Sequence, residues 1–306
     1  MSQVSFSVVI ACHNHEAFVQ SAVMSALSQS LPAKEVIVID DASVDRTPEI
    51  LKSFGASITF ERVARNQGAS AARNRGASLA SGEYVVFLDG DDVLMSHALH
   101  LYGRLVSAGH PKIILGRCEV CGDRTPMVQR ARPPVQIQFV EYPDFLSKDR
   151  PWVYNSSSLV VHRTTFLCAG GWSEEMFYQD IQDLLNKMGD SGKTVLVLEP
   201  ATVWYRMHSA NAIRKIKPFV QGIYVLLTKA RRGLYPGGRA YRKKREAWFG
   251  GLIFYWTREA IRNKDYRSGF SLLASRWWLI LLAMIRRCVA CVRGRKRIVS
   301  LLLEQK

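Results

Sequence analysis

The chain has 306 residues, of which 48% are hydrophobic and 22% charged, and its formal net charge is +16. This is enough apolar sequence to bury a sizeable core in one large or two modest domains. The charge is unevenly distributed, so the protein is not basic throughout. Residues 1–200 contain 18 Lys and Arg and 22 Asp and Glu, a net charge of −4, whereas residues 201–306 contain 24 Lys and Arg and 4 Asp and Glu, a net charge of +20.

The chain shows no pattern of a secretory signal at its start, and we expect no membrane span. The longest apolar run, residues 277–285, ends at Arg286 and is shorter than the ~18 residues that a span needs. Six cysteines are few, which indicates a reducing, cytoplasmic setting. Two CxxC pairs, at 118/121 and 288/291, lie far apart and lack nearby histidines, so we interpret them as core cysteines rather than zinc ligands.

The first 120 residues alternate between strand-like and helix-like segments. Strands are predicted at 7–11, 35–40, 57–62, 84–88 and 112–116, and helices at 15–29, 46–54, 69–80 and 96–108. This alternation is typical of a parallel sheet flanked by helices. The apolar runs are continuous, as in strands that are buried on both faces.

The rest of the chain divides into three parts. Residues 120–150 have a loop-like composition, residues 152–208 mix strand-like and helix-like segments, and residues from 213 onward are basic and helical. We therefore predict one α/β domain over 1–212, with halves at 1–118 and 119–212. A basic, tryptophan-rich helical extension would cover 213–306.

Two predicted strands end in acidic residues. Asp40 and Asp41 close the second, and Asp89, Asp91 and Asp92 follow the fourth. Ligands of open α/β sheets bind at the carboxyl ends of the strands. A single Asp there is well explained as a cap of the next helix or turn. Three acids within four residues repel one another unless a cation lies among them, and Mg²⁺ commonly joins carboxylates to substrate phosphates.

A glycine-rich phosphate loop is missing where the predicted fold would place one. ACHNHEAF follows the first strand instead of GxGxxG, and GDSGKT at 189–194 lacks the first glycine of a Walker motif. A cation, rather than backbone amides, would then neutralise the phosphates. This favours a nucleotide-sugar site over a nucleotide hydrolase.

Five motifs in order resemble glycosyltransferase family 2, the inverting enzymes with the GT-A fold, a Rossmann-like α/β fold. They are SVVIACHNHEAFVQSAVMSALSQ, EVIVIDDASVDRT, NQGASAARNRGASLASGEYVVFLDGDD, GGWSEEMFYQD and VWYRMHSAN, between residue 5 and about residue 210. The resemblance implies an enzyme that transfers a sugar from a nucleotide-diphosphate sugar, with UDP as the implied nucleotide, to a hydroxyl acceptor.

The family's roles are carried over residue by residue. The resemblance implies that the donor nucleotide contacts Ala11, Asn14, Asp40, Asp41, Arg73, Asp89 and Gly90. It leaves open which of Asp40 and Asp41 contacts the base. Asp91 and His208 would hold Mn²⁺ or Mg²⁺, Asp89 is an alternative or additional ligand, and Asp92 would support the loop.

The family's catalytic base corresponds to Asp180. The family has Glu-Asp where this chain has Gln179-Asp180, and Asp183 is the fallback. A base that lies across the sugar from the leaving diphosphate produces inversion, and the cation stabilises the charge of that leaving group. The alternative for Asp180 is a helix N-terminal charge that the helix dipole favours.

Two other functions remain open at this point. FLDGDDVL also fits a haloacid-dehalogenase-type phosphatase, with Asp89 as nucleophile and Asp91 as acid/base, although three strand–helix units precede it. Gln179 leans towards a non-catalytic sugar-nucleotide-binding protein.

The basic extension interleaves Lys and Arg with aromatic residues, as in RKKR at 242–245 and RGRKR at 293–297. No nucleic-acid-binding signature appears, so a nucleic-acid partner is disfavoured. The segment from Trp277 to Arg297 favours peripheral attachment to the anionic inner face of the cell membrane. A lipid-linked or envelope-polysaccharide acceptor would suit that location.

Overall fold

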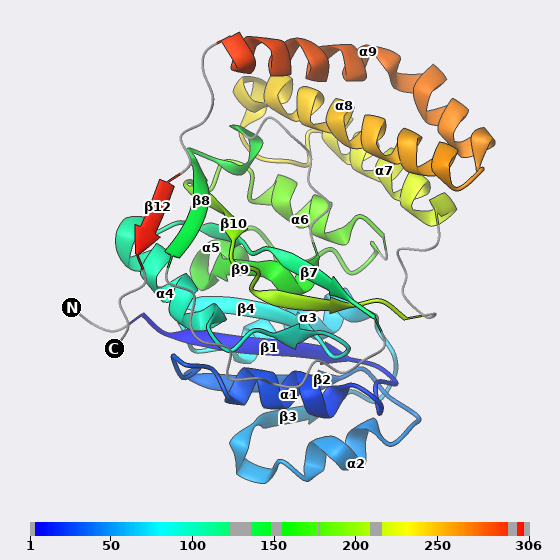
Figure 1. Ribbon diagram of the computed structural model, residues 1–306. Coiled ribbons are helices and arrows are strands. Elements are labelled where there is room, and N and C mark those ends of the chain that lie inside the picture. The colour runs from blue at the N-terminus through cyan, green and yellow to red at the C-terminus, as the bar shows by residue number, and fades with distance from the viewer. Residues whose placement is uncertain are drawn as a thin grey trace.

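The computed structural model describes residues 4–122, 136–147, 155–176, 178–208, 216–292 and 299–302. The basic run predicted at 293–297 and about half of the predicted loop at 120–150 lie outside the described residues. The chain forms a central sheet with helices on both faces and a stack of three further helices on one side (Figure 1). The predicted α/β class, with a helical C-terminal region, is confirmed.

The central sheet has nine strands in the order β12-β8-β10-β6-β9-β4-β1-β2-β3. The four strands β4, β1, β2 and β3 are mutually parallel, whereas β9 runs antiparallel to both of its neighbours. The strand bounds are β1 Phe6–Cys12, β2 Glu35–Asp40, β3 Thr59–Arg62, β4 Tyr84–Asp89, β6 Ile113–Leu115, β8 Gln136–Tyr142, β9 Leu159–His162, β10 Thr194–Glu199 and β12 Val299–Leu302.

Successive residues of each central strand enter different cores, because side chains alternate across a sheet. Val8 and Ile10 of β1 pack with helices α1 (Val19–Leu27) and α4 (Ala98–Gly109) on one face. Val9 and Ala11 pack on the other face with α3 (Ala69–Leu79) and α6 (Asp180–Lys187). The continuous apolar runs of the sequence are explained by this double burial. The short helices are α2 (Thr47–Lys52) and α5 (Arg163–Cys168).

A second, three-stranded sheet adjoins the carboxyl end of β4. Its order is β5-β11-β7, with β5 at Val93–Leu94, β11 at Val203–Arg206 and β7 at Cys118–Cys121. β5 begins directly after the acidic turn at 89–92, and β11 pairs with it. The small sheet therefore carries the chain towards His208 beside the acidic turn.

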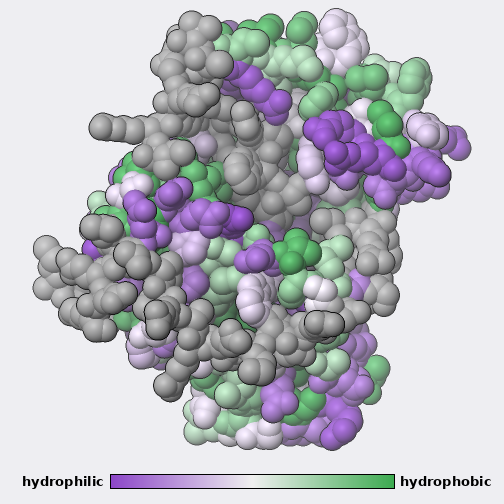
Figure 2. Space-filling model, viewed as in Figure 1, coloured by the Kyte–Doolittle hydropathy of each residue, from purple (hydrophilic) through white to green (hydrophobic). Residues whose placement is uncertain are grey.

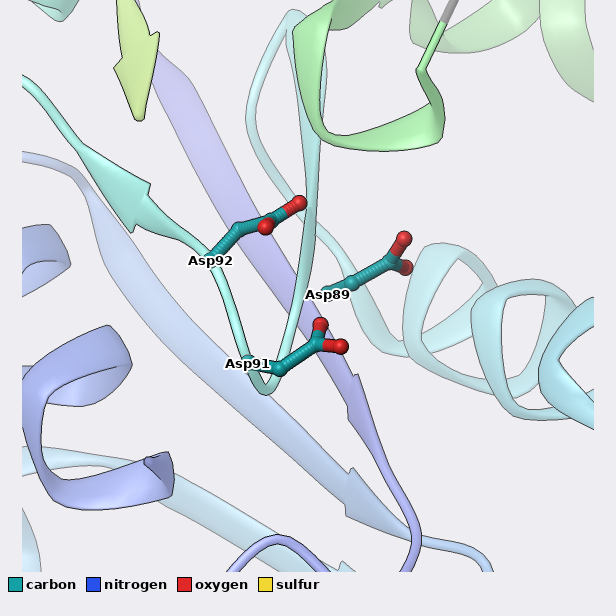
Figure 3. A group of neighbouring side chains, drawn as sticks. All are labelled: Asp89, Asp91 and Asp92. Atoms are coloured by element: carbon teal, nitrogen blue, oxygen red, sulfur yellow. The ribbon is translucent and has the colours of Figure 1, made fainter. Parts of the chain in front are cut away.

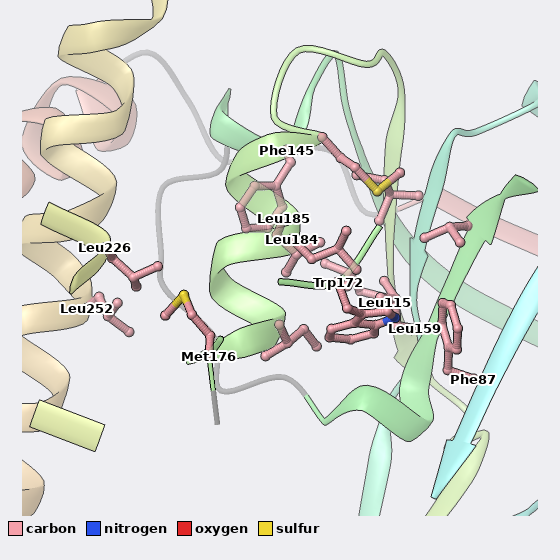
Figure 4. Packing of buried hydrophobic residues seen from close by; sticks show 14 of the residues in the cluster. Phe87, Leu115, Phe145, Leu159, Trp172, Met176, Leu184, Leu185, Leu226 and Leu252 are labelled. Atoms are coloured by element: carbon pink, nitrogen blue, oxygen red, sulfur yellow. The ribbon is translucent and has the colours of Figure 1, made fainter. Parts of the chain in front are cut away.

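The helical extension packs on α6, on the side away from the sheet. It consists of α7 (Ile216–Arg231), α8 (Gly238–Arg262) and α9 (Tyr266–Val292), and α9 is the outermost layer (Figure 1). Leu226 of α7 and Leu252 of α8 belong to the same buried cluster as Leu184 of α6 and Phe87 of β4 (Figure 4). One hydrophobic core thus continues from the sheet into the extension.

Three features differ from the sequence-based expectations. β8 lies within the segment predicted as loop, and alternating burial along Gln136–Tyr142 fits an edge-side strand. β12 lies within the 213–306 segment predicted as helical, and it pairs with β8 across a large sequence separation that local patterns do not report. Within the described residues, one helical stretch, Tyr266–Val289, is long and apolar enough to cross a membrane by length and composition alone, a stretch that the count of uninterrupted apolar residues did not find.

Candidate active site

The candidate site lies where the parallel strands end. β1 ends beside β4 and β2, with Ala11 opposite Asp89 and Cys12 opposite Asp40 in register. Gly90 donates its backbone N–H to the Ala11 carbonyl at 2.9 Å. A Cβ at Gly90 would lie 2.6 Å from the Cys12 Cβ, so the turn from β4 into the acidic loop requires a glycine there.

The three carboxylates of this loop form one group. Each of Asp89, Asp91 and Asp92 offers an oxygen, and these oxygens all lie within 4.8 Å of one another (Figure 3). The environments of the three side chains nevertheless differ. Asp92 is fully buried, whereas Asp89 and Asp91 are partly exposed.

Asp92 fastens the loop to its surroundings. Its carboxylate accepts hydrogen bonds from the Ser157 hydroxyl at 2.5 Å, the Asn155 amide at 3.1 Å and the Arg206 backbone N–H at 3.0 Å. Burial raises the pKa of Asp92 well above its usual value, and the charges of Asp91 and Asp89 raise it further. The supporting role expected for Asp92 agrees with these contacts.

Asp91 faces His208 across the loop. The His208 Nε2 lies 3.0 Å from an Asp91 carboxylate oxygen. Phe18 stacks on the His208 ring. The Arg206 guanidinium also lies over the Phe18 ring, 4.7 Å from its centroid. Arg206 Nε also donates to the Asp91 carbonyl at 2.9 Å. These contacts bring together the two residues that the resemblance assigned to a metal.

The donor atoms fit a hard divalent cation. Carboxylate oxygens are the ligands that Mg²⁺ and Mn²⁺ prefer, and imidazole is an acceptable addition. Burial is the main cause of the raised pKa of Asp92, and the charges of Asp91 and Asp89 add to it; a cation between Asp89 and Asp91 would offset that added repulsion. Asp91, His208 and Asp89 are therefore the residues that would hold the ion.

Arg73 links this loop to α6. Its Nη2 donates to Asp89 Oδ1 at 2.7 Å and to the Ser156 hydroxyl at 2.9 Å, and its Nη1 donates to Asp180 Oδ2 at 3.1 Å. The guanidinium also lies over the Trp172 ring. Burial opposes ionisation of Asp89, but Arg73 and the Ser156 hydroxyl outweigh it and lower the pKa of Asp89. One buried cation thus holds two acids from distant segments.

Asp180 is the first residue of α6. The preceding Gln179 has φ +63°, a left-handed conformation that turns the chain into the helix. Burial raises the pKa of Asp180 above its usual value, although Arg73 favours the ionised form. A carboxylate with a raised pKa that is 23% exposed at the site is suited to accept a proton.

Asp183, the fallback base, lies one turn further along α6 and is fully buried. It accepts a hydrogen bond from the Tyr235 hydroxyl at 2.6 Å and pairs with Lys229 of α7 at 2.9 Å. The Ser173 hydroxyl donates to its other oxygen at 2.5 Å. These contacts favour Asp180 over Asp183 as the candidate base.

The residues expected to face the base and ribose have protein partners. Asp41 is buried, and its two oxygens accept the backbone N–H groups of Gln67 and Gly68 at 2.8 and 2.7 Å. Asp40 is fully buried and pairs with Arg62 at 3.2 Å. In this arrangement, Asp41 holds the turn before α3 and Asp40 links the end of β2 to the end of β3, at the rim that also carries Asp89.

Asn14 joins the two loops at the same rim. Its φ is +56°, and its side-chain oxygen accepts the Val44 backbone N–H at 2.8 Å. Its own backbone N–H donates to the Ser43 hydroxyl at 2.8 Å. Asn14 thus fixes the loop after β1 against the loop after β2.

Several contributing residues were not assigned a role from the sequence. Ser156, Ser157 and Asn155 bind the acids, Arg206 binds the loop, and Trp172 covers Arg73. The polar run NSSS before a buried strand was the available signal, since polar residues there must find partners.

Solved structures share this arrangement of sheet and helices. The chain matches the crystal structure of S. aureus TarS 1-349 in complex with UDP-GlcNAc with a TM-score of 0.65 and 15% identity, over 92% of this chain and 82% of that chain. A likeness at this identity shows the fold, here the GT-A class. The chain itself belongs to glycosyl transferase family 2, because that family's model matches residues 7–166. The same match disfavours the dehalogenase-type phosphatase, since it includes FLDGDDVL.

Curated relatives each match only part of this chain, between 29% and 43% of it for the first three and the synthase named below. A cholesterol galactosyltransferase of Borreliella burgdorferi is 39% identical over 101 residues, which cover 32% of this chain and 28% of the relative. A poly-beta-1,6-N-acetyl-D-glucosamine synthase of Staphylococcus epidermidis is 41% identical over 90 residues, covering 29% and 22%. The first three curated relatives are matched over only 22% to 36% of their own lengths.

Proposed function

We propose that the protein is an inverting glycosyltransferase that moves a sugar from a nucleotide-diphosphate sugar to a hydroxyl acceptor. The carrying observation is the Arg73 bridge, which holds Asp89 of the acidic loop and Asp180 of α6 on one guanidinium. A transferase needs these two acids to face one site, one for the donor and one for the acceptor. The Arg73 bridge supports this requirement, because it brings together Asp89 and Asp180, which are 91 residues apart in the sequence.

UDP is the proposed nucleotide. The likeness to TarS in complex with UDP-GlcNAc supports a uridine sugar nucleotide as the donor, and the family match supports a sugar nucleotide in general. Ala11, Asn14, Asp40, Asp41, Arg73, Asp89 and Gly90 are the proposed nucleotide-binding residues.

Mn²⁺ or Mg²⁺ bound by Asp91, His208 and Asp89 would stabilise the negative charge of the leaving diphosphate. Asp180 accepts the proton of the attacking hydroxyl, and its raised pKa makes it a stronger base than an ordinary Asp. Arg73 keeps the Asp180 carboxylate oriented and partly compensates its burial. Attack from the Asp180 side, opposite the diphosphate, inverts the anomeric carbon.

The proposed acceptor is a glycan or lipid-linked hydroxyl of the cell envelope, and the proposed location is the cytoplasm, at the inner face of the cell membrane. Relatives named for polysaccharide and lipid glycosylation support this acceptor class. The non-catalytic alternative rested on Gln179. The Gln179 side chain donates to the Phe219 carbonyl of α7 at 3.3 Å, so it connects the start of α6, which carries Asp180, to α7.

A donor screen tests the proposal. We expect one UDP-sugar to raise the melting temperature only when Mn²⁺ or Mg²⁺ is present, and UDP release from that donor to require an acceptor hydroxyl. The product's anomeric configuration, read by NMR, should be opposite to that of the donor. Failure of every nucleotide sugar to stabilise the protein with metal, together with no UDP release, would refute the proposal.

A further inference from the structure

Helix α9 presents a broad apolar face that no described part of the chain covers. Phe270 is 72% exposed and Trp277 59% exposed, and the face also includes Leu273, Trp278, Leu281, Leu282, Met284, Ile285 and Val289. Figure 2 shows hydrophobic residues gathered along the top of the molecule, where α9 lies in Figure 1. Contiguous exposed apolar surface of this kind marks an interaction site.

The opposite side of α9 is fixed to α8. Leu272, Leu279 and Ile280 are buried in the core that contains α8. A Cβ on Gly250 of α8 would lie 1.8 Å from the Leu279 carbonyl oxygen, so the two backbones touch. To cross a bilayer, α9 would have to leave this contact and expose the α8 side of the core. The packing therefore favours a helix that lies on a membrane over one that spans it.

The charges around this face are positive. α9 contains four arginines and no acidic residue; exposed Arg262 ends α8 before it, and in the intervening turn the charges of Lys264 and Asp265 offset each other. Of the four acids in residues 201–306, Glu246 and Glu259 already pair with Arg242 and Arg262. A second copy of the chain would bring like charges together, whereas anionic lipid headgroups would be attracted.

Trp277 and Trp278 follow a kink in α9. Arg276 there has φ −149° and ψ 25°, outside helical values, and the two indoles are exposed directly after it. Tryptophan is favoured at the level of lipid headgroups, because its ring is apolar and its N–H is polar. The kink thus presents two interfacial anchors beside the apolar stripe.

We propose that the exposed face of α9 docks the protein flat on an anionic lipid bilayer, with Trp277, Trp278 and the following apolar residues inserted at the headgroup boundary. This gives the protein a membrane partner independently of which sugar it transfers. α8 covers the other side of α9 and keeps the helix parallel to the surface.

Vesicle sedimentation with the full chain tests this docking. We expect the protein to pellet with phosphatidylglycerol/phosphatidylcholine vesicles and not with pure phosphatidylcholine. Binding should weaken with added salt, since the screening length falls from ~10 Å at 0.1 M to ~3 Å at 1 M. Indole fluorescence should shift to the blue on binding.

A pair of matched variants locates the surface. Trp277→Ser with Leu281→Ser should reduce partitioning by roughly tenfold or more, since each side chain loses apolar burial. The control, Leu27→Ser with Leu167→Ser, removes apolar residues that are 37% and 42% exposed on α1 and α5, and should bind like the wild type. Circular dichroism melts check that all three proteins are folded.

Three results would overturn the docking proposal. The first is wild-type protein that stays in solution with anionic vesicles at low salt, and the second is a folded α9 variant that binds as well as the control. The third is a dimer in lipid-free sedimentation velocity that the α9 variant alone abolishes, which would assign the face to a second copy. None of these measurements requires sugar transfer, so they fail or succeed independently of the proposed activity.

Discussion

The substitutions Asp180→Asn and Asp183→Asn should separate chemistry from stability on a single helix. Asp180 is partly exposed beside the acidic loop, whereas Asp183, one turn along α6, is fully buried against the extension. The same change of carboxylate to amide should therefore lower the rate at the first position and the melting temperature at the second.

The rate effect follows from the proposed base role. Loss of a general base costs about 10²–10⁴ in kcat, or about 3–5 kcal/mol of transition-state stabilisation. The stability effect of Asp180→Asn should stay within about 1 kcal/mol, because the amide oxygen can still accept the hydrogen bond from Arg73. Arg73 also keeps Asp89 and Ser156 as partners. Burial disfavours the Asp180 charge, so the neutral amide removes that penalty.

Asp183→Asn has the opposite profile. It removes the buried counter-charge of Lys229, 2.9 Å away, and leaves the exposed Glu175 at 3.2 Å as the acidic partner of Lys229. It also changes the Tyr235 hydrogen bond at 2.6 Å. Breaking a buried pair costs about 3–5 kcal/mol. In a chain of this size, that lowers the melting temperature by on the order of 10 °C.

The assay is UDP release with the donor from the screen and a saturating acceptor, paired with thermal melts of each variant. An Asp180→Asn protein that keeps more than a tenth of the wild-type kcat would refute the assignment of the base. A stable but inactive Asp183→Asn protein would assign the base role to Asp183 in place of Asp180.

Three further outcomes follow from the site. Burial raises the pKa of Asp180, so the ionised base is lost as the pH falls through that raised value. The acid limb of a kcat/KM profile should therefore lie above the usual Asp pKa of ~4. This limb should be absent in Asp180→Asn. Asp91→Asn should weaken Mn²⁺ affinity at least about tenfold, since ligand charge sets affinity, and titration of the metal-dependent melting shift measures this. Unchanged affinity would remove Asp91 from the metal site. Gly90→Ala should cost about 1–3 kcal/mol in thermal melts, because its Cβ would meet the Cys12 Cβ at 2.6 Å; a neutral change would mean that the turn relaxes freely.

Much of the N-terminal fold was predictable because local signals agree there. Residues 35–40 form β2 and residues 69–79 form α3, within a residue or two of the predicted ranges. β8 and β12 were missed because an edge pairing between residues about 160 apart leaves no local trace. The membrane-length stretch in α9 was missed because counting only uninterrupted apolar residues overlooks a helix that tolerates isolated arginines.

The site was predictable in its members more than in its connections. The acids at 89–92 follow from their density at one strand end, and the resemblance supplied His208 and Asp180. That Arg73 would bridge Asp89 and Asp180 is a tertiary fact, since the three residues come from three separate elements. The inward bonds of Asp40 and Asp41 likewise depend on loops that pack only in the folded chain.

The buried contact between Asp183 and the extension bears on how the protein can be divided. A truncation at residue 212 would remove Lys229 and Tyr235, the partners of the Asp183 carboxylate. It would also expose the apolar side of α6 to solvent. The helix that starts with Asp180 would lose its outer support at the same moment. A protein shortened at residue 212 is therefore a poor substitute for the full chain, and the C-terminal helices are better regarded as the support of α6 than as a detachable tail.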